Sequence, residues 1–328
     1  MENILSIKNL SVSLSGKRGI VPILHNISLD VEEGHILGIV GESGSGKSMT
    51  AFAITQLLPG GRKSIVDGSI SFCGQNLTEK TEKEMTKFRG KEIAMIFQEP
   101  MTCLNPVFTI GRQMKDVIMT HQKKSSKEAG IQAEEMLEKV HIRNPHRVLN
   151  CYPYELSGGM RQRVMIAIAL SCSPKLLIAD EPTTALDVTI QAQIIFLIKE
   201  ACKATGTGVI FISHDLGVVS QLCDTIAVMY SGQIVEVGKA VDVLAYPHHP
   251  YTKALLASIP SFTPREDGDD KLSAIPGMVP DPLEVITGCR FAPRCSYAMD
   301  VCHKQIPPLQ VFADGHSLHC HLQKEVEN

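Results

Sequence analysis

A glycine-rich segment near the start of the chain has the composition and the setting of a phosphate-binding loop. It follows the apolar stretch 36–40 and precedes a helix-compatible stretch, 49–58. Glycines allow backbone N–H groups to curl around phosphate oxygens, and the positive end of the following helix points at them. A lysine and a serine at the end of the segment suit the β/γ-phosphates and Mg²⁺ respectively. The residues predicted to bind a nucleotide here are Gly41, Ser43, Gly44, Ser45, Gly46, Lys47, Ser48 and Met49.

An acidic pair, Asp180 and Glu181, follows a second apolar run, 176–179. We expect this run to be a buried strand, and the nucleotide sites of open α/β sheets gather at the carboxyl ends of such strands. Asp180 is then placed to hold Mg²⁺, commonly through water, and Glu181 to polarise the attacking water. A structural alternative is that the pair only caps the next helix. Together, the loop and the pair imply hydrolysis of ATP or GTP.

Apolar periodicity predicts the elements that position these residues. Leu10, Val12 and Leu14 alternate with serines, which indicates a half-buried strand near the start of the chain. Between later apolar runs lies a helical pattern, 190–201, which ends at Gly206. Such alternation predicts an α/β fold with a largely parallel core sheet. The runs predicted to be buried strands of that sheet are 93–97, 176–179, 209–212 and 226–229.

Two segments depart from this alternation. Residues from about 99 to 171 show helix-period apolar spacing and no convincing strand, which predicts an inserted helical subdomain with 120–128 as a solvated connection. Ten of the eighteen prolines fall between residues 247 and 308, so we predict an irregular appended module rather than a regular layer. We therefore divide the chain into a domain over 1–245, with the helical subdomain at about 99–171, and a C-terminal extension over 246–328.

The overall composition bounds the class of protein. Of the 328 residues 44% are apolar, enough for one large domain and a smaller one. A net charge of −3 without a long basic block argues against binding to nucleic acid. No run approaches the roughly 18 apolar residues of a membrane span, and the start lacks a charged-then-apolar export signal. We expect a peripheral protein at the cytoplasmic face of the cell membrane, touching the membrane only through other proteins.

A third motif narrows the class of nucleotide enzyme. Residues 156–163 read Leu-Ser-Gly-Gly-Met-Arg-Gln-Arg and open a helical run, and this segment resembles the signature motif of the ATP-binding cassette (ABC) family. Three further matches occur in that family's order, namely Gln98 with the Q-loop, 185–187 with the D-loop and His214 with the switch histidine. The resemblance implies a P-loop NTPase of the ABC nucleotide-binding type, with antiparallel N-terminal strands beside a mixed, largely parallel core sheet.

The resemblance also implies roles for single residues. Gln98, Glu181 and His214 would act in catalysis, with His214 steadying the γ-phosphate. A serine and glycines at a helix start make a second anion site besides the phosphate-binding loop. One nucleotide can contact both sites only if a second subunit supplies one of them. Ser157 and Gly159 would therefore contact the γ-phosphate held by the loop of a facing ATPase subunit. The implied ligands of the Mg²⁺ of MgATP are Ser48, Gln98 and Asp180.

Two departures from the family pattern affect these expectations. Met160 stands where many cassettes have glutamine, so we do not assign to its side chain the contact that glutamine makes in those proteins. The first 34 residues contain no aromatic residue, and the base-stacking tyrosine of many cassettes is therefore missing. We expect Leu14, Ile20 or Val21 to pack on adenine instead, with base recognition weaker by about 1 kcal/mol than with an aromatic partner.

Four further segments resemble the oligopeptide, dipeptide and nickel importers of the ABC family. They are 97–106, 249–256, 288–295 and, typical of the D-type subunit, 275–280. The resemblance implies an ATP-hydrolysing subunit that powers uptake of dipeptides or oligopeptides, or alternatively of nickel or a nickel chelate. The implied partners are a second, paralogous ATPase, two membrane permeases and an extracytoplasmic solute-binding protein. A permease helix would dock in a groove near Gln98.

A rival from another class is a cassette protein that acts on ribosomes or DNA rather than in transport. Such proteins generally carry tandem cassettes or a long coiled-coil insertion together with basic surfaces. This chain shows neither tandem cassettes nor such an insertion, and its net charge is negative. A transport subunit is therefore our interpretation.

Four cysteines crowd the end of the chain, at Cys289, Cys295, Cys302 and Cys320. Four thiolates in a cytosolic chain would complete a [4Fe–4S] cluster or a Zn²⁺ site, and disulfides are disfavoured there. The spacing lacks the C-x₂-C pairs of zinc knuckles, so a metal site and a purely packing role both stay open. A nickel-sensing role is the alternative for the nearby histidines, 316, 319 and 321, which we interpret as exposed tail residues.

Overall fold

Two β-sheets organise the chain in the computed structural model, which describes residues 3–16, 19–61, 64–98, 103–183, 187–258 and 275–322. The strands of the smaller sheet are β1 (Asn3–Gly16), β2 (Gly19–Glu32), β4 (Ile65–Phe72) and β5 (Gln75–Asn76). They are antiparallel in the order β2-β1-β4-β5. Leu10 and Val12 of β1 are fully buried, which confirms the strand predicted near the start.

The larger sheet carries the residues that could do chemistry. Its strands are β3 (Ile36–Val40), β6 (Ile93–Ile96), β7 (Leu176–Asp180), β8 (Gly208–Ser213), β9 (Thr225–Tyr230), β10 (Gln233–Lys239), β11 (Leu309–Val311) and β12 (Ser317–His319). Their order is β11-β12-β10-β9-β3-β8-β7-β6. The five strands from β9 to β6 pair in parallel, so the parallel core predicted from the apolar runs is confirmed. The carboxyl ends of these strands therefore meet at one edge.

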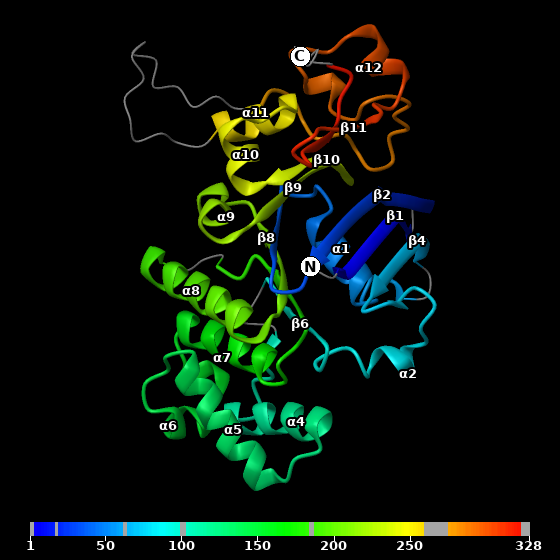
Figure 1. The fold of residues 1–328 in the computed structure, drawn as a ribbon. Coiled ribbons are helices and arrows are strands. Elements are labelled where there is room, and N and C mark those ends of the chain that lie inside the picture. The colour runs from blue at the N-terminus through cyan, green and yellow to red at the C-terminus, as the bar shows by residue number, and fades with distance from the viewer. Residues whose placement is uncertain are drawn as a thin grey trace, which may run out of the picture.

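Helices cover the larger sheet, and a separate group extends from one end of it (Figure 1). The helices outside that group are α1 (Lys47–Ile54), α2 (Glu82–Met85), α8 (Val188–Thr205), α9 (Leu216–Leu222), α10 (Ala240–Ala245), α11 (Pro250–Ala257) and α12 (Asp300–Lys304). As predicted, α8 ends at Gly206, and this residue adopts the left-handed conformation. None of the helices in the described ranges combines the length and apolarity that crossing a membrane requires.

The separate group occupies the segment whose apolar spacing predicts helices. It consists of α4 (Ile110–Gln122), α5 (Ser126–Lys139), α6 (Pro145–Leu149) and α7 (Gly158–Leu170). The predicted connection over 120–128 is wrong at both ends, since only residues 123–125 separate α4 from α5. The reason is a capping box, in which Ser125 and Glu128 bond each other's backbone and start α5 within the polar stretch.

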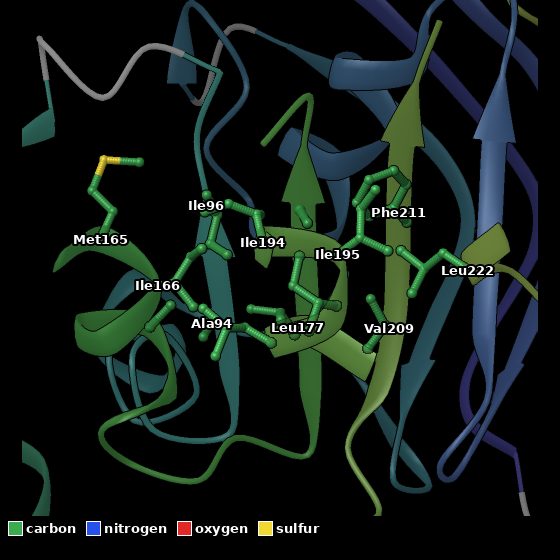
Figure 2. Close-up of a cluster of buried hydrophobic side chains, with 14 of the residues drawn as sticks. Ala94, Ile96, Met165, Ile166, Leu177, Ile194, Ile195, Val209, Phe211 and Leu222 are labelled. Atoms are coloured by element: carbon green, nitrogen blue, oxygen red, sulfur yellow. The ribbon is translucent and has the colours of Figure 1, made fainter. Parts of the chain in front are cut away.

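One side of the core joins α7 and α8 to the parallel strands. Figure 2 shows Ile166 of α7 and Ile194 of α8 directed at strand residues such as Leu177, and all three are fully buried. Each large apolar side chain buried in this way contributes about 1.5–3 kcal/mol. This packing fixes the start of α7, where the signature motif lies, relative to the ends of β6, β7 and β8.

The C-terminal extension is only partly irregular. Its strand β12 pairs with β10, with Leu318 opposite Glu236 and Ser317 opposite Val237, and β11 pairs with β12. The prediction that this region cannot form a sheet layer is therefore wrong for residues 309–319. The open edge of β10 needs hydrogen-bond partners, and this short hairpin supplies them although prolines precede it.

His316 is not an exposed tail residue, and that prediction is also wrong. It is 3% exposed, and its Nε2 lies 2.7 Å from Oε1 of Glu236, which is fully buried in β10. The same carboxylate accepts hydrogen bonds from the backbone N–H groups of His248 and His249 at the start of α11. A buried carboxylate requires such partners, so Glu236 ties the hairpin and α11 to the core sheet.

Candidate nucleotide-binding site

The predicted phosphate-binding loop joins β3 to α1, the strand–loop–helix setting that its sequence predicts. β3 is buried throughout and lies between β8 and β9. Gly46 caps α1 with φ 104°, a conformation that favours glycine. Gly41 has φ 154°, and a Cβ there would lie 2.1 Å from the Met229 carbonyl oxygen of β9. Backbone conformation and packing therefore favour glycine at these positions.

Lys47 lies across the loop. Its side-chain nitrogen donates hydrogen bonds to the carbonyl oxygens of Gly41 (2.8 Å) and Glu42 (3.0 Å), and the residue is only 5% exposed. Burial lowers the pKa of Lys47, while the carboxylates of Glu181, Asp180 and Glu42 act in the opposite direction. A cation so enclosed by loop backbone is suited to binding phosphate oxygens.

Ser48 and Asp180 come together from α1 and from the end of β7. The Ser48 hydroxyl donates to Oδ1 of Asp180 at 3.0 Å, and Asp180 is 2% exposed. Burial raises the pKa of this carboxyl, and the hydrogen bond from Ser48 partly opposes that rise. A hydroxyl and a carboxylate side by side are the hard oxygen ligands that Mg²⁺ prefers, so this donor set fits the ion.

Glu181 is the centre of a second contact group. Nε2 of Gln98 donates to Oε2 of Glu181 at 2.9 Å, and Nδ1 of His214 lies 3.3 Å from Oε1. These residues follow β6, β7 and β8, which are neighbours in the sheet. The structure therefore brings residues of three separate sequence motifs together at one edge of the sheet.

The backbone at Glu181 is unusual for a residue with a side chain. Its φ is 46°, in the left-handed region, and its N–H donates to the carbonyl oxygen of Ile212 in β8. Such a conformation costs about 1–3 kcal/mol and tends to occur at functional sites. It sets the direction in which the carboxylate leaves the end of β7.

The signature segment lies at the start of α7. Ser157 is the N-cap, and its hydroxyl accepts a hydrogen bond from the Met160 N–H. A Cβ on Gly159 would lie 3.3 Å from a methyl carbon of Ile190 in α8, so the helix start packs closely there. Among the described contacts, Ser157 and Gly159 bond or pack within α7 and against α8 rather than on the phosphate-binding loop.

The D-loop match lies mostly outside the described residues, because 184–186 are not among them. Asp187, its last position, is the N-cap of α8 and accepts a hydrogen bond from the Ile190 N–H at 2.9 Å.

Three residues at the loop escaped the sequence prediction. Glu42 donates its N–H to the Tyr251 hydroxyl at 2.9 Å, and its carboxylate accepts from Arg294 at 2.7 and 3.1 Å. More than two hundred residues separate Glu42 from each partner. No local spacing could indicate such contacts.

The four late cysteines lie in one neighbourhood. Cys302 and Cys320 are buried, and the N–H of Cys289 donates to the Cys302 carbonyl oxygen at 2.7 Å. Burial raises the pKa of Cys289 to about 11, and the nearby Cys302 and Cys320 add to this rise. Burial also raises the pKa of Cys295, and the nearby Cys302 adds to this rise. Within the described ranges, however, no set of three or more His, Cys, Asp or Glu side chains is arranged to hold a metal ion.

An apolar groove of about 280 Å³ opens beside Phe97, next to Gln98. It lies between the end of α1, strand β6 and helices α4 and α7, and His121 and Arg89 add polar groups to its wall. Its apolar lining includes Leu57, Ile93, Met95, Leu104, Val117 and Met165.

Comparison with known proteins agrees with this geometry. Residues 24–184 match the family model described as ABC transporter, and residues 235–302 match the model described as oligopeptide/dipeptide transporter, C-terminal region. The chain is 49% identical to the probable peptide ABC transporter ATP-binding protein y4tR of Sinorhizobium fredii, over 99% of this chain and 96% of that protein. It is 48% identical to the oligopeptide transport ATP-binding protein AppD of Bacillus subtilis, over 99% and 98%.

The fold also resembles solved ABC cassettes. The dimeric cassette MJ0796, solved in a post-hydrolysis state with ADP and Pi, is 28% identical with a TM-score of 0.65, and the match covers 72% of this chain and 98% of that one. CbiO1 of Clostridium perfringens, described as part of the transporter complex CbiONQ, is 25% identical with a TM-score of 0.63, over 75% and 92%. With the matched family models and relatives similar over nearly its whole length, the chain belongs to the ABC transporter ATP-binding proteins, in the oligopeptide/dipeptide subfamily.

Proposed function

We propose that this chain hydrolyses ATP to power the uptake of oligopeptides or dipeptides across the cell membrane. The observation that carries the proposal is the convergence of Gln98, Glu181 and His214 beside Lys47 and Asp180 at the carboxyl ends of parallel strands. The names of its relatives, which are peptide and oligopeptide transport proteins, support the substrate class. None of those names mentions nickel, so the nickel alternative has no support from them.

Each residue of the site has a role in this proposal. Lys47 and the loop N–H groups bind the β/γ-phosphates, while Ser48, Asp180 and Gln98 hold Mg²⁺, which would neutralise phosphate charge. Glu181 accepts a proton from the attacking water, and Gln98 holds that carboxylate in place through its 2.9 Å hydrogen bond. His214, on the other side of the carboxylate, steadies the γ-phosphate.

The ATP site is completed by a second subunit in this proposal. Ser157 caps α7 without contacting the phosphate-binding loop, which leaves the helix start to serve the nucleotide of a facing ATPase. The dimeric form of MJ0796 supports such an arrangement. We expect the facing subunit to be a similar but non-identical ATPase.

The apolar groove beside Phe97 is the proposed docking site of a permease helix. Its lining is largely apolar and includes Phe97, the chain neighbour of Gln98, so a docked helix would act next to a residue of the ATP site. The chain would then lie at the cytoplasmic face of the membrane, held by two permeases that receive solute from an extracytoplasmic binding protein. In this assembly we assign 1–245 to the ATPase domain, with its helical subdomain at about 99–171, and 246–328 to the extension.

Replacement of Leu57 tests the docking. Leu57 lines the groove and is 43% exposed, so Leu57→Lys should abolish co-purification with the permeases in detergent while MgATP binding persists. Ile131→Lys on α5 is a matched control, because Ile131 is 53% exposed and does not line the groove. Equal permease recovery for both variants would place the docking site elsewhere. Uptake of a radiolabelled peptide, with Ni²⁺ as competitor, tests the substrate class.

A metal site at Cys289, Cys295, Cys302 and Cys320 is a separate proposal. It is supported by four thiols that share one neighbourhood, although their present arrangement is not that of a ligand set. A bound [4Fe–4S] cluster or Zn²⁺ would draw the thiols together as ligands. Elemental analysis and visible absorption of anaerobically purified chain decide the matter. A colourless, metal-free and folded sample would leave the cysteines a packing role.

A further inference from the structure

The phosphate-binding loop contains a carboxylate whose partner comes from the C-terminal extension. Glu42 is the second residue of the loop, directly after Gly41, and its side chain forms a bidentate ion pair with Arg294. Nη1 donates to Oε2 at 2.7 Å and Nη2 to Oε1 at 3.1 Å. Parallel hydrogen bonds of this kind are the strongest form of arginine–carboxylate contact.

Contacts other than the one with Glu42 also hold the Arg294 side chain in place. Its Nε donates to the carbonyl oxygen of Pro276 at 2.9 Å, its guanidinium lies 5.7 Å from the centre of the Tyr230 ring, and its side chain is 4% exposed. The hydrogen bond with Glu42 raises the pKa of Arg294 further, so the group stays charged at every relevant pH. The extension thus places a permanent cation behind the loop.

Two backbone atoms of Glu42 also form hydrogen bonds. Its N–H donates to the hydroxyl of Tyr251 in α11, and its carbonyl oxygen accepts from the Lys47 ammonium. One residue therefore connects the extension to the lysine that faces phosphate. Any movement of Glu42 would alter the position of Lys47.

A carboxylate in this loop is electrostatically unfavourable for the loop's proposed ligand. ATP brings a highly charged anion to the loop, and a nearby negative charge lowers affinity for it unless a cation neutralises that charge. Arg294 neutralises Glu42 and directs its carboxylate toward the extension. Because Arg294 balances the charge of Glu42, that carboxylate competes less for the Lys47 ammonium, which favours contacts of Lys47 with phosphate oxygens.

We propose that Arg294 is a positioning residue of the ATP site, which neutralises Glu42 and directs its carboxylate toward the extension so that the loop can accept the polyphosphate chain. This inference rests on the proposed nucleotide site and adds the C-terminal extension to it. The extension would then be required for ATP affinity, independently of any role in binding transported solute or metal.

The test is a set of replacements in the full-length chain, with affinities for MgATP and MgADP measured by calorimetry. We expect Arg294→Gln to weaken MgATP binding about tenfold, and MgADP binding less, because the exposed carboxylate repels the extra phosphate charge. Adding Glu42→Gln to this variant should restore MgATP affinity to within about threefold of wild type, since no unpaired charge remains. Arg294→Lys should retain most of the affinity, because it keeps the charge.

Arg290→Gln is the matched control. Arg290 is another buried arginine of the extension, but its Nε donates to Ser231 and not to the loop carboxylate. Its replacement should lower the stability of the fold without changing the affinities for MgATP and MgADP to different extents. Circular dichroism and thermal unfolding show whether each variant is folded.

Two results would overturn the inference. One is wild-type MgATP affinity in folded Arg294→Gln, and the other is an unrestored loss in the double variant, which would indicate a packing defect. If Arg294→Gln does not fold, the single variant Glu42→Gln decides. The inference predicts that Glu42→Gln binds MgATP more tightly than wild type, and a tenfold loss of its affinity would contradict the inference. Failure of wild-type chain to bind MgATP would instead remove the nucleotide site, so the two failures are distinguishable.

Discussion

Replacement of Glu181 by glutamine is the sharpest test of the catalytic assignment. Glutamine keeps the length and shape of the side chain, and its amide oxygen can still accept the hydrogen bond from Gln98. The backbone strain at φ 46° is the same for both residues, because neither is glycine. The variant therefore removes the proton acceptor and the charge while the geometry of the site is retained.

The expected loss in turnover follows from the role of the carboxylate. Loss of a positioned general base lowers the rate about 10²-fold or more, which raises the activation free energy by about 2.7 kcal/mol or more. ATP binding should persist, because the side-chain contacts of Lys47 and Ser48 do not involve Glu181. Glu181 is the leading charge that raises the pKa of Lys47, so its neutralisation should tighten MgATP binding rather than weaken it.

The assay is steady-state phosphate release by the full-length chain, alone and co-purified with its permeases, beside calorimetric binding of MgATP. Glu200→Gln is a suitable control, because Glu200 is an exposed acid on α8, away from the ends of the parallel strands. Turnover within about threefold of wild type in folded Glu181→Gln would refute the base assignment, since such a change is less than 1 kcal/mol. Loss of MgATP binding would refute the argument that binding and proton transfer use separate contacts.

Three further predictions concern the loop, the signature helix and pH. Gly41→Ala should destabilise the chain by about 2–4 kcal/mol in urea unfolding and weaken MgATP binding, because its Cβ would meet the Met229 carbonyl oxygen at 2.1 Å. Ser157→Ala should cost about 1 kcal/mol through loss of the α7 cap. It should also lower turnover while MgATP binding to the isolated chain stays unchanged, and weakened binding there would argue against a role at the opposite site. Burial lowers the pKa of His249 to about 3, so protonation favours the unfolded chain. The free energy of unfolding should therefore fall by about 1.4 kcal/mol for each pH unit between pH 6.5 and about 3. His249→Asn, which keeps a side-chain acceptor for the Tyr251 N–H, should flatten this dependence, and an unchanged slope would assign it to other groups.

The parallel core was predictable because its strands are buried on both faces. Runs such as Ile93–Ile96 and Leu176–Asp180 are therefore almost continuously apolar, which is a signal that a single sequence carries. The phosphate-binding loop was predictable for a related reason, since the glycines that close backbone contacts require, such as Gly41, are readable as residue types.

The C-terminal hairpin was not predictable on these grounds. β11 and β12 have three residues each, and Leu318 is the only one of the six that is buried, so neither length nor alternation marks them. His316 looks like a polar tail residue until Glu236 of a distant strand is placed against it. The Glu42–Arg294 pair has the same character, because only the folded chain brings those positions together.

The central place of β3 in the sheet has a consequence for the order of events during synthesis. β3 (Ile36–Val40) leaves the ribosome early, but its neighbours β8 and β9 begin at Gly208 and Thr225. Until β8 has emerged, the strand that leads into the loop has no hydrogen-bonded neighbour in the sheet, and until β9 has emerged the Met229 carbonyl that packs on Gly41 is absent. A nascent chain therefore carries the complete loop sequence long before it can carry the loop conformation, and we expect no capture of ATP until β9 has been synthesised.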